Sequence, residues 1–100
     1  MINQLVMIGK IKELPNDAHD ELILEVRRNY KNSDGVFEKD HFKCYLWMAI
    51  SKKIMLTCKE GDLIAVKGRV VEDNGVCKIF AEQVVLLNKM VSIENEVQKI

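Results

Sequence analysis

The segment FKCYLW, residues 42–47, places aromatic rings and a lysine close together along the chain. Because a strand sends alternate side chains to opposite faces, this segment is predicted to have one apolar face and one mixed face. The apolar face, typical of a protein core, holds Phe42, Cys44 and Leu46. The mixed face holds His41, Lys43, Tyr45 and Trp47. Rings beside a cation can stack on a planar ligand and neutralise an anion, but the same rings could instead cover a hydrophobic patch or an oligomer interface.

Length and composition predict a single compact domain. One hundred residues, 48% of them hydrophobic, can bury about two thirds of the surface that the unfolded chain exposes. No run reaches the roughly 18 apolar residues of a membrane helix, and the first residues lack a signal-peptide pattern, so no membrane association and a cytoplasmic location are expected. Cys44, Cys58 and Cys77 are widely spaced, which predicts buried thiols and neither a disulfide framework nor a metal site.

Charge is balanced overall but segregated along the chain. The formal net charge is zero, which argues weakly against a polyanionic partner. Residues 13–26 carry only acidic charges, whereas residues 27–59 hold most of the bases and all but one of the aromatic residues. The basic block could bind a polyanion, or its charges could simply solvate the surface.

An enzymatic function is not expected, and no cofactor is indicated. His19 and His41 are the only histidines, and no Ser-His-Asp or Cys-His order suggests a nucleophile with its base. The sequence also lacks a glycine-rich phosphate loop that ends in Gly-Lys-Ser/Thr. The candidate chemistry is therefore binding.

Five strands and one helix are predicted to position these residues. Strands are expected over residues 2–11, 22–30, 37–49, 62–72 and 76–87. Gly9 interrupts the first strand and predicts a bulge or a close backbone approach. Turn residues at 31–35 and at Asn74-Gly75 predict two hairpins. Ser51 as N-cap and Gly61 as stop predict a short helix between the third and fourth strands.

This order predicts an all-β fold, a five-stranded Greek-key OB-fold barrel with one short helix between strands three and four. The barrel domain is expected to cover residues 1–89. Residues 90–100 are a C-terminal extension, for which an amphipathic segment and a frayed tail are both open.

From Met1 to about Leu87 the chain resembles the bacterial single-stranded DNA-binding protein family. The matching pieces, in order, are MINQLVMIGKI, LILEVRRNYKNSDG, FKCYLW, GDLIAVKGRV and IFAEQVVLL. The resemblance implies an OB-fold that binds single-stranded DNA without sequence preference in replication, recombination or repair. It also implies a homo-oligomer, a dimer or tetramer, assembled partly through the first strand, with replication or repair proteins as possible partners.

The resemblance also assigns candidate DNA-binding residues. Tyr30, His41 and Trp47 fall where the family places its base-stacking aromatics, and Lys43 where it often has a phosphate-binding arginine. Tyr45 shares the predicted face with Lys43 and Trp47. Nearby bases are expected to contact phosphates: Arg27, Arg28, Lys31 and Lys52.

The chain departs from the family pattern at three points, of which the first favours weaker binding and the last means that partner recruitment by the family's terminal tail cannot be carried over. His41 replaces a large aromatic, the hairpin at Asn74-Gly75 is shorter than the family's last long loop, and the chain ends NEVQKI in place of an acidic tail with a terminal aromatic. The alternative function is therefore an OB-fold protein-interaction module, or a primosomal accessory subunit, with weak nucleic-acid binding.

The first predicted strand is apolar on both faces. Ile2, Val6 and Ile8 have one parity, and Leu5 and Met7 the other. A strand covered on both sides has this pattern, which predicts at least a homodimer. In the alternative, the second face packs under the loop at residues 13–21.

Overall fold

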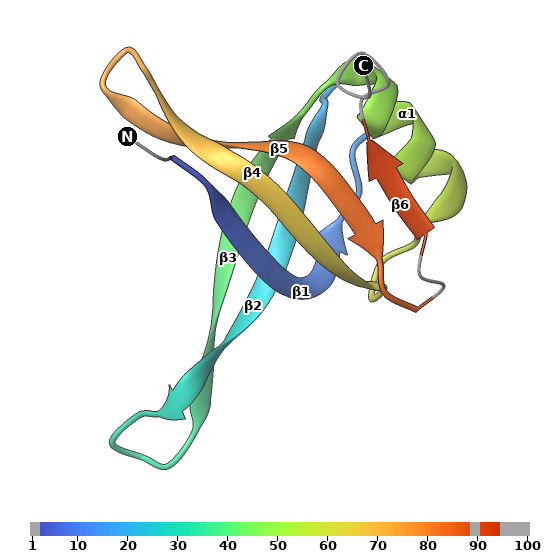
Figure 1. Cartoon of the computed structure of the whole chain (residues 1–100). Helices are drawn as coiled ribbons and strands as arrows, with labels where there is room; N and C mark the ends of the chain where they lie inside the picture. Colours follow the sequence, from blue (N-terminus) through green and yellow to red (C-terminus); the bar gives the residue numbers. More distant parts are fainter. Residues whose placement is uncertain (1–2, 89–90, 95–100) are drawn as a thin grey trace.

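The computed structural model describes residues 3–88 and 91–94. Strands dominate it, with one helix in the middle of the chain (Figure 1). The elements are β1 (Leu5–Glu13), β2 (Glu21–Lys31), β3 (Phe37–Leu46), α1 (Met48–Thr57), β4 (Leu63–Asp73), β5 (Val76–Leu86) and β6 (Val91–Glu94).

The strands close into a barrel. Antiparallel neighbours run in the order β3-β2-β1-β4-β5, and a parallel pairing of β3 with β5 closes the ring from Cys44↔Ile79 to Leu46↔Ala81. With α1 between β3 and β4, this is the OB-fold arrangement, so the predicted fold class is confirmed. A further short strand, β6, pairs antiparallel with the second half of β5. The rest of the predicted C-terminal extension lies outside the described residues.

The core follows the predicted alternation. Its buried apolar side chains come from every element between β1 and β5: Ile11, Leu22, Leu24, Cys44, Leu46, Ile50, Ile54, Cys58, Ile64, Val66, Ala81, Val84 and Leu86. Phe42 packs against this cluster with Cys44 and Leu46, as the parity of FKCYLW predicted. The prediction of buried thiols is correct for Cys44 and Cys58 but wrong for Cys77, which is exposed near the tip of the β4–β5 hairpin, beyond the core.

Two glycines allow strands to come unusually close. A Cβ atom on Gly9 would overlap the backbone carbonyl oxygen of Glu25, so the predicted close approach in the first strand is confirmed. A Cβ atom on Gly68 would overlap the carbonyl oxygen of Phe80, next to the point where the β4–β5 register shifts. These positions admit only glycine without backbone displacement.

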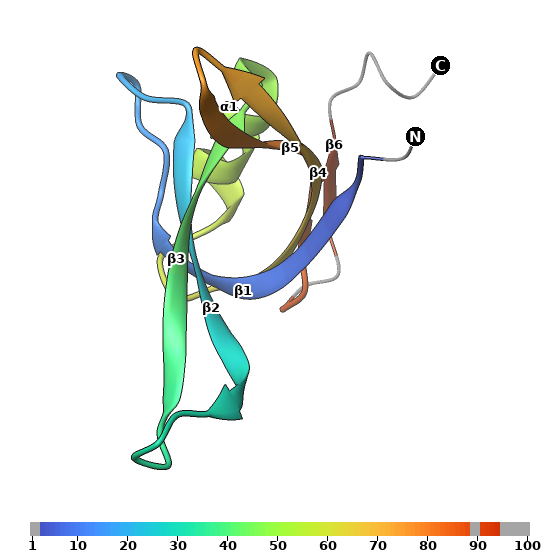
Figure 2. The ribbon, with the colours of Figure 1, turned by 90° about the vertical axis from the view of Figure 1, so that its left-hand side faces the viewer.

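The β2–β3 hairpin projects beyond the barrel as an arm, from Arg27 to Lys39 (Figures 1 and 2). The loop at its tip is closed by Asn32, whose backbone N–H donates to Val36 O at 2.9 Å and whose Oδ1 accepts from the backbone N–H of Asp34 and of Val36. The β4–β5 hairpin ends in the predicted Asn74-Gly75 turn, where both residues have positive φ.

The helix begins and ends earlier than predicted. Trp47 is the N-cap and Ser51 lies inside α1, donating its backbone N–H to Trp47 O at 2.9 Å, so strand β3 ends at Leu46 and not at residue 49. The Ser51 side chain is fully buried, which an N-cap hydroxyl seldom is. Gly61 is not the helix stop. It has a φ of +89° and donates its N–H to Ile11 O at 2.8 Å, so it turns the chain into contact with β1.

Candidate nucleic-acid interface

The outer face of the β2–β3 sheet carries the mixed residues of the sequence pattern. Register pairs place side chains of the two strands directly opposite each other, at Glu25↔His41, Ile23↔Lys43 and Glu21↔Tyr45. Arg27↔Lys39 continues the same row toward the arm. We call this row the outer face. His41, Lys43 and Tyr45, predicted to share a face, do share it.

At the barrel seam, three aromatic rings gather on the outer face. Phe80 of β5 pairs with Tyr45 across the seam, and their ring centroids are 6.0 Å apart. Trp47 follows β3 and lies 6.3 Å from Phe80, with its side chain 44% exposed. Lys78, two residues before Phe80, places its Nζ 5.0 Å above the Tyr45 ring. We call Tyr45, Trp47 and Phe80 the aromatic platform.

Sequence analysis missed Phe80 and Lys78. Along β5 they alternate with Ile79 and Ala81, which point inward, so parity alone puts them outside. Their place beside Tyr45 depends on the parallel β3–β5 pairing, which joins segments far apart in sequence. The sequence did offer one signal, because Lys78 and Phe80 lie two residues apart in the last predicted strand and so share its outward face.

A second cationic cluster lies on the arm. The Arg27 guanidinium carbon is 4.8 Å from the centroid of the Phe37 ring, and Lys31 Nζ is 5.6 Å from it. These two predicted phosphate contacts therefore come together on one aromatic ring. Both keep their charge accessible, since Arg27 and Lys31 are exposed.

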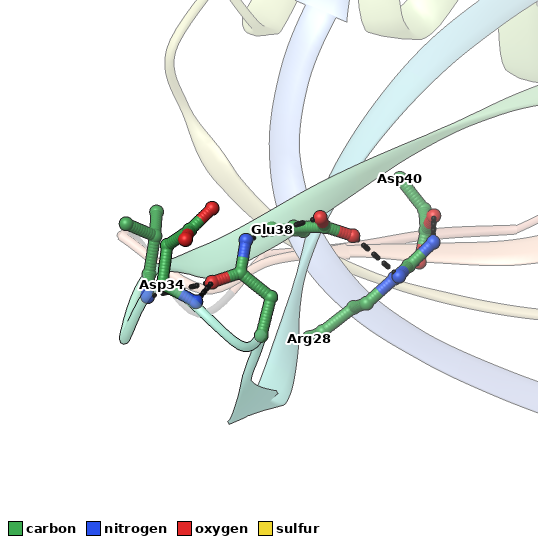
Figure 3. A network of polar contacts seen from close by, with 6 residues as sticks. Arg28, Asp34, Glu38 and Asp40 are labelled. Carbon is green, nitrogen blue, oxygen red and sulfur yellow. Dashed lines mark hydrogen bonds and ion pairs between the residues drawn. The ribbon is translucent and has the colours of Figure 1, made fainter.

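Arg28 faces the other way and is held by two carboxylates (Figure 3). Its Nε and Nη2 donate to Asp40 at 3.0 and 2.9 Å, and its Nη1 donates to Glu38 at 2.6 Å. Asn32 also donates to Glu38, which ties the network to the tip loop. The hydrogen bond from Arg28 holds the pKa of Asp40 below its usual range. The network braces the arm, and its guanidinium is already bidentately paired.

The other two predicted residues lie apart from the platform. Tyr30 is on the arm, 61% exposed, in the stretch where the β2–β3 register shifts between Arg27 and Lys31. Lys52 is exposed on α1, one turn after Trp47. The structure thus brings His41, Lys43, Tyr45 and Trp47 onto one surface and leaves Tyr30, Arg28 and Lys52 outside it.

The basic side chains of β3 on the outer face are paired with acids of β2. His41 Nε2 is 3.1 Å from Glu25 Oε1, and Lys39 Nζ is 3.7 Å from Glu25 Oε2. The Lys43 Nζ is 3.5 Å from Glu21 Oε2. The contact with His41, followed by the charge of Lys39, lowers the pKa of Glu25, so this carboxylate stays ionised at neutral pH.

Beside the arm, the outer surface of β1 is apolar and open. Val6 and Ile8 are 67% and 57% exposed, so the loop at residues 13–21 does not cover them, and that alternative is wrong. Ile8 also lines a hollow of about 510 Å³ between β1 and β2, together with Lys10, Arg27 and Leu63. Leu5 and Met7, of opposite parity, are half-buried toward the core.

Two kinds of feature are absent from residues 3–88 and 91–94. None of their helices is long and apolar enough to cross a bilayer. Within the same ranges, no three His, Cys, Asp or Glu side chains gather in a way that could hold a metal ion.

Two known proteins with similar sequences are bacterial single-stranded DNA-binding proteins. No protein-family model matches this chain. The single-stranded DNA-binding protein 1 of Streptococcus pyogenes is 35% identical over 77 residues, which are 70% of this chain and 59% of that protein. The protein of the same name from Lactococcus lactis is 31% identical over 77 residues, covering 70% of this chain and 51% of its own length. The chain thus spans between one half and three fifths of these relatives.

Solved structures agree with the fold. The mitochondrial single-stranded DNA-binding protein Rim1 of S. cerevisiae matches with a TM-score of 0.68 over 87% of this chain and 96% of that one. Its sequence identity is 10%, so this match concerns the arrangement of the strands and helix alone.

Proposed function

Because this chain is a homologue of the bacterial single-stranded DNA-binding proteins and has the OB-fold, we propose that it binds single-stranded DNA without sequence preference. In this proposal bases stack on the aromatic platform, and phosphates contact the nearby cations of the outer face and of the arm. The process served would be replication, recombination or repair.

The observation that supports the proposal most strongly is the aromatic platform. Three rings, from β3, β5 and the N-cap of α1, lie in one partly exposed group, with Lys78, itself paired with Asp73, over one of them and Lys43 on the neighbouring row. Stacking on aromatic side chains tolerates any base, because every base has a flat π-face.

A fluorescence titration tests the proposal directly. Trp47 is the only tryptophan, so its emission reports on the platform without labelling. Addition of a dT oligomer is expected to quench it, because a stacked base contacts the indole. A dC oligomer should quench it similarly. No quenching, together with no shift in the anisotropy of a labelled oligomer, would exclude DNA binding at this surface.

Binding is expected to depend on salt. If three or four cations contact phosphates, a plot of log K against log salt should have a slope of roughly −2 to −3, from about −0.7 for each neutralised phosphate of a single strand. Candidates on accessible surface are Arg27, Lys31 and Lys52, together with Lys43, whose contact with Glu21 a phosphate would have to displace. A flat plot would remove the basic residues from the binding mechanism and leave stacking alone.

We also propose that the chain forms a homo-oligomer through β1. Val6 and Ile8 present apolar surface that nothing else in the described residues covers. Wild-type protein at tens of micromolar is expected to have at least the mass of a dimer in light scattering. The Val6→Asp variant should shift to the monomer mass, because assembly would bury an unpaired carboxylate.

A matched variant controls that experiment. Leu56 is 85% exposed on α1, away from β1, and Leu56→Asp introduces the same charge on another apolar surface. This variant should keep the wild-type mass. A monomeric wild-type protein would contradict the proposal, and so would a Val6→Asp variant that assembles normally with an unchanged circular dichroism spectrum.

A second candidate function is a protein-binding OB module with weak DNA affinity. The pairing of Lys39, His41 and Lys43 with β2 carboxylates favours it, because paired cations attract phosphates less. The dT titration separates the two functions. Saturable quenching at micromolar oligomer supports the DNA-binding protein, whereas its absence in a correctly assembled sample favours the module.

A further inference from the structure

Every β3 cation on the outer face between Lys39 and Lys43 faces a carboxylate of β2. Glu25 lies opposite His41 and diagonal to Lys39, while Glu21 lies diagonal to Lys43. Cross-strand neighbours at these positions are close enough to interact as pairs. Two acids thus contact three potential phosphate ligands in the middle of the candidate interface.

These pairs do little for folding stability. The side chains of the two lysines and His41 are about half exposed, and ion pairs at such positions contribute about 0 to 1 kcal/mol. The Arg28 network differs, because it is bidentate and braces the arm. A role in ligand choice accounts for the Glu21 and Glu25 contacts better than a role in stability.

A phosphate and a glutamate carboxylate compete for the same donor groups. To contact Lys43, a phosphate must displace the Glu21 carboxylate or approach close to it. The attraction to the lysine is then offset by repulsion from the acid, which remains beside the phosphate. Lys78, which lies over the Tyr45 ring, is paired with Asp73, but neither Glu21 nor Glu25 occupies a platform ring, so these two acids leave the stacking part of the binding energy unaffected.

We propose that Glu21 and Glu25 make the outer face select single-stranded over duplex DNA, by competing with phosphates for Lys39, His41 and Lys43. Duplex DNA offers mainly phosphates to a flat surface, because its bases are stacked inside the helix. A single strand can turn its bases out onto the aromatic platform. The two acids therefore penalise the ligand that relies on charge and spare the ligand that stacks. This inference rests on the proposed DNA-binding function.

The test uses Glu25→Gln and the double variant Glu21→Gln/Glu25→Gln. Glutamine keeps the size and a hydrogen-bonding oxygen of glutamate but removes the charge. Glu72→Gln is the control for Glu25→Gln, because Glu72 is exposed on β4, outside the β2–β3 row, and each of these two variants removes one negative charge. Affinities for labelled dT and for a labelled duplex are measured by anisotropy at several salt concentrations, alongside wild type.

For Glu25→Gln, duplex affinity at low salt is expected to rise about fivefold, since one unit charge about 4 Å from another is worth about 1 kcal/mol in water. The double variant should gain more for duplex than for dT, so the ratio of the two affinities falls. Its salt slope for dT should steepen by about 0.7 for each released cation that meets a phosphate. Glu72→Gln should change either affinity less than twofold, because salt screens remote charges.

Three results would overturn the inference. The first is an equal gain in affinity for dT and for duplex in the double variant. The second is a gain in duplex affinity in Glu72→Gln as large as that in Glu25→Gln. The third is loss of dT binding in Glu25→Gln, which would make the acid a positioning group. If wild-type protein binds no dT, the proposed function fails by itself. The double variant then still tests whether Glu21 and Glu25 mask the basic side chains of β3. If it acquires duplex binding, the acids do mask them. If it binds neither ligand, the inference fails too.

Discussion

Replacing Trp47 with alanine is expected to weaken single-strand binding by about 1 to 3 kcal/mol, or roughly 5- to 150-fold, the usual contribution of one base-aromatic stack. The loss should be nearly equal for dT and dC oligomers, because the ring contacts any base. Folding should persist. Trp47 caps α1 through its backbone oxygen and makes no side-chain cap bond, so alanine can still begin the helix.

Anisotropy of a labelled oligomer measures this change, since the variant has no tryptophan, and light scattering on the same sample gives its mass. Trp47→Phe should recover most of the affinity, because it restores a ring beside Phe80. Leu56→Ala removes another exposed apolar side chain, from α1 and away from the platform, and should bind normally. If Trp47→Ala instead lowers the mass of the assembly and its thermal stability, and DNA affinity falls only as assembly falls, the ring covers an oligomer interface. Unchanged affinity in a correctly assembled variant would reject the platform.

Replacing Gly68 with alanine should lower the free energy of unfolding by about 3 kcal/mol, the upper part of the range for overpacked sites. The new Cβ would overlap the carbonyl oxygen of Phe80 and press on Ala81, and both neighbours are backbone of a paired strand that cannot rotate away. For a domain of this size the loss corresponds to a fall in Tm of roughly 12 to 24 °C. Urea unfolding followed by circular dichroism measures it.

Gly35→Asn is the matched control. Gly35 has a φ of +77° in the tip loop of the arm and nothing within 4 Å of an added Cβ, and asparagine tolerates this conformation. Its stability should stay within about 0.5 kcal/mol of wild type. If Gly68→Ala unfolds at the same urea concentration as Gly35→Asn, β4 and β5 do not approach as closely as described.

Much of the fold was predictable because apolar alternation and turn residues act locally. The period-two pattern of Leu22 and Leu24, the Asn74-Gly75 turn and the close approach at Gly9 all led to correct elements. The helix start was wrong because Ser51 has the residue type of an N-cap, while its burial against the barrel is a tertiary effect. Strand β6 was left open, since residues 90–100 carry no strong pattern.

The candidate site was harder to predict because it depends on which strand faces which. Arg27 and Arg28 are adjacent in sequence and look equivalent, yet parity sends one to the outer face and the other into the Asp40 network. The pairing of Glu25 with His41 follows from the hairpin register, which turn residues alone do not fix. Phe80 joins the platform only through the parallel seam.

That seam has a consequence for how the protein folds. It joins residues 44–46 to residues 79–81, whereas both long hairpins pair residues near each other in sequence. Pairs of low sequence separation cost little chain entropy to close, so the hairpins can form before the parallel seam and before the still more distant β1–β4 pairing, which joins Leu5 to Gly68. Tyr45 and Phe80 sit on opposite sides of the seam. The stacking surface thus depends on a long-range pairing, and a partly folded chain with both hairpins intact but the seam unpaired would not possess it.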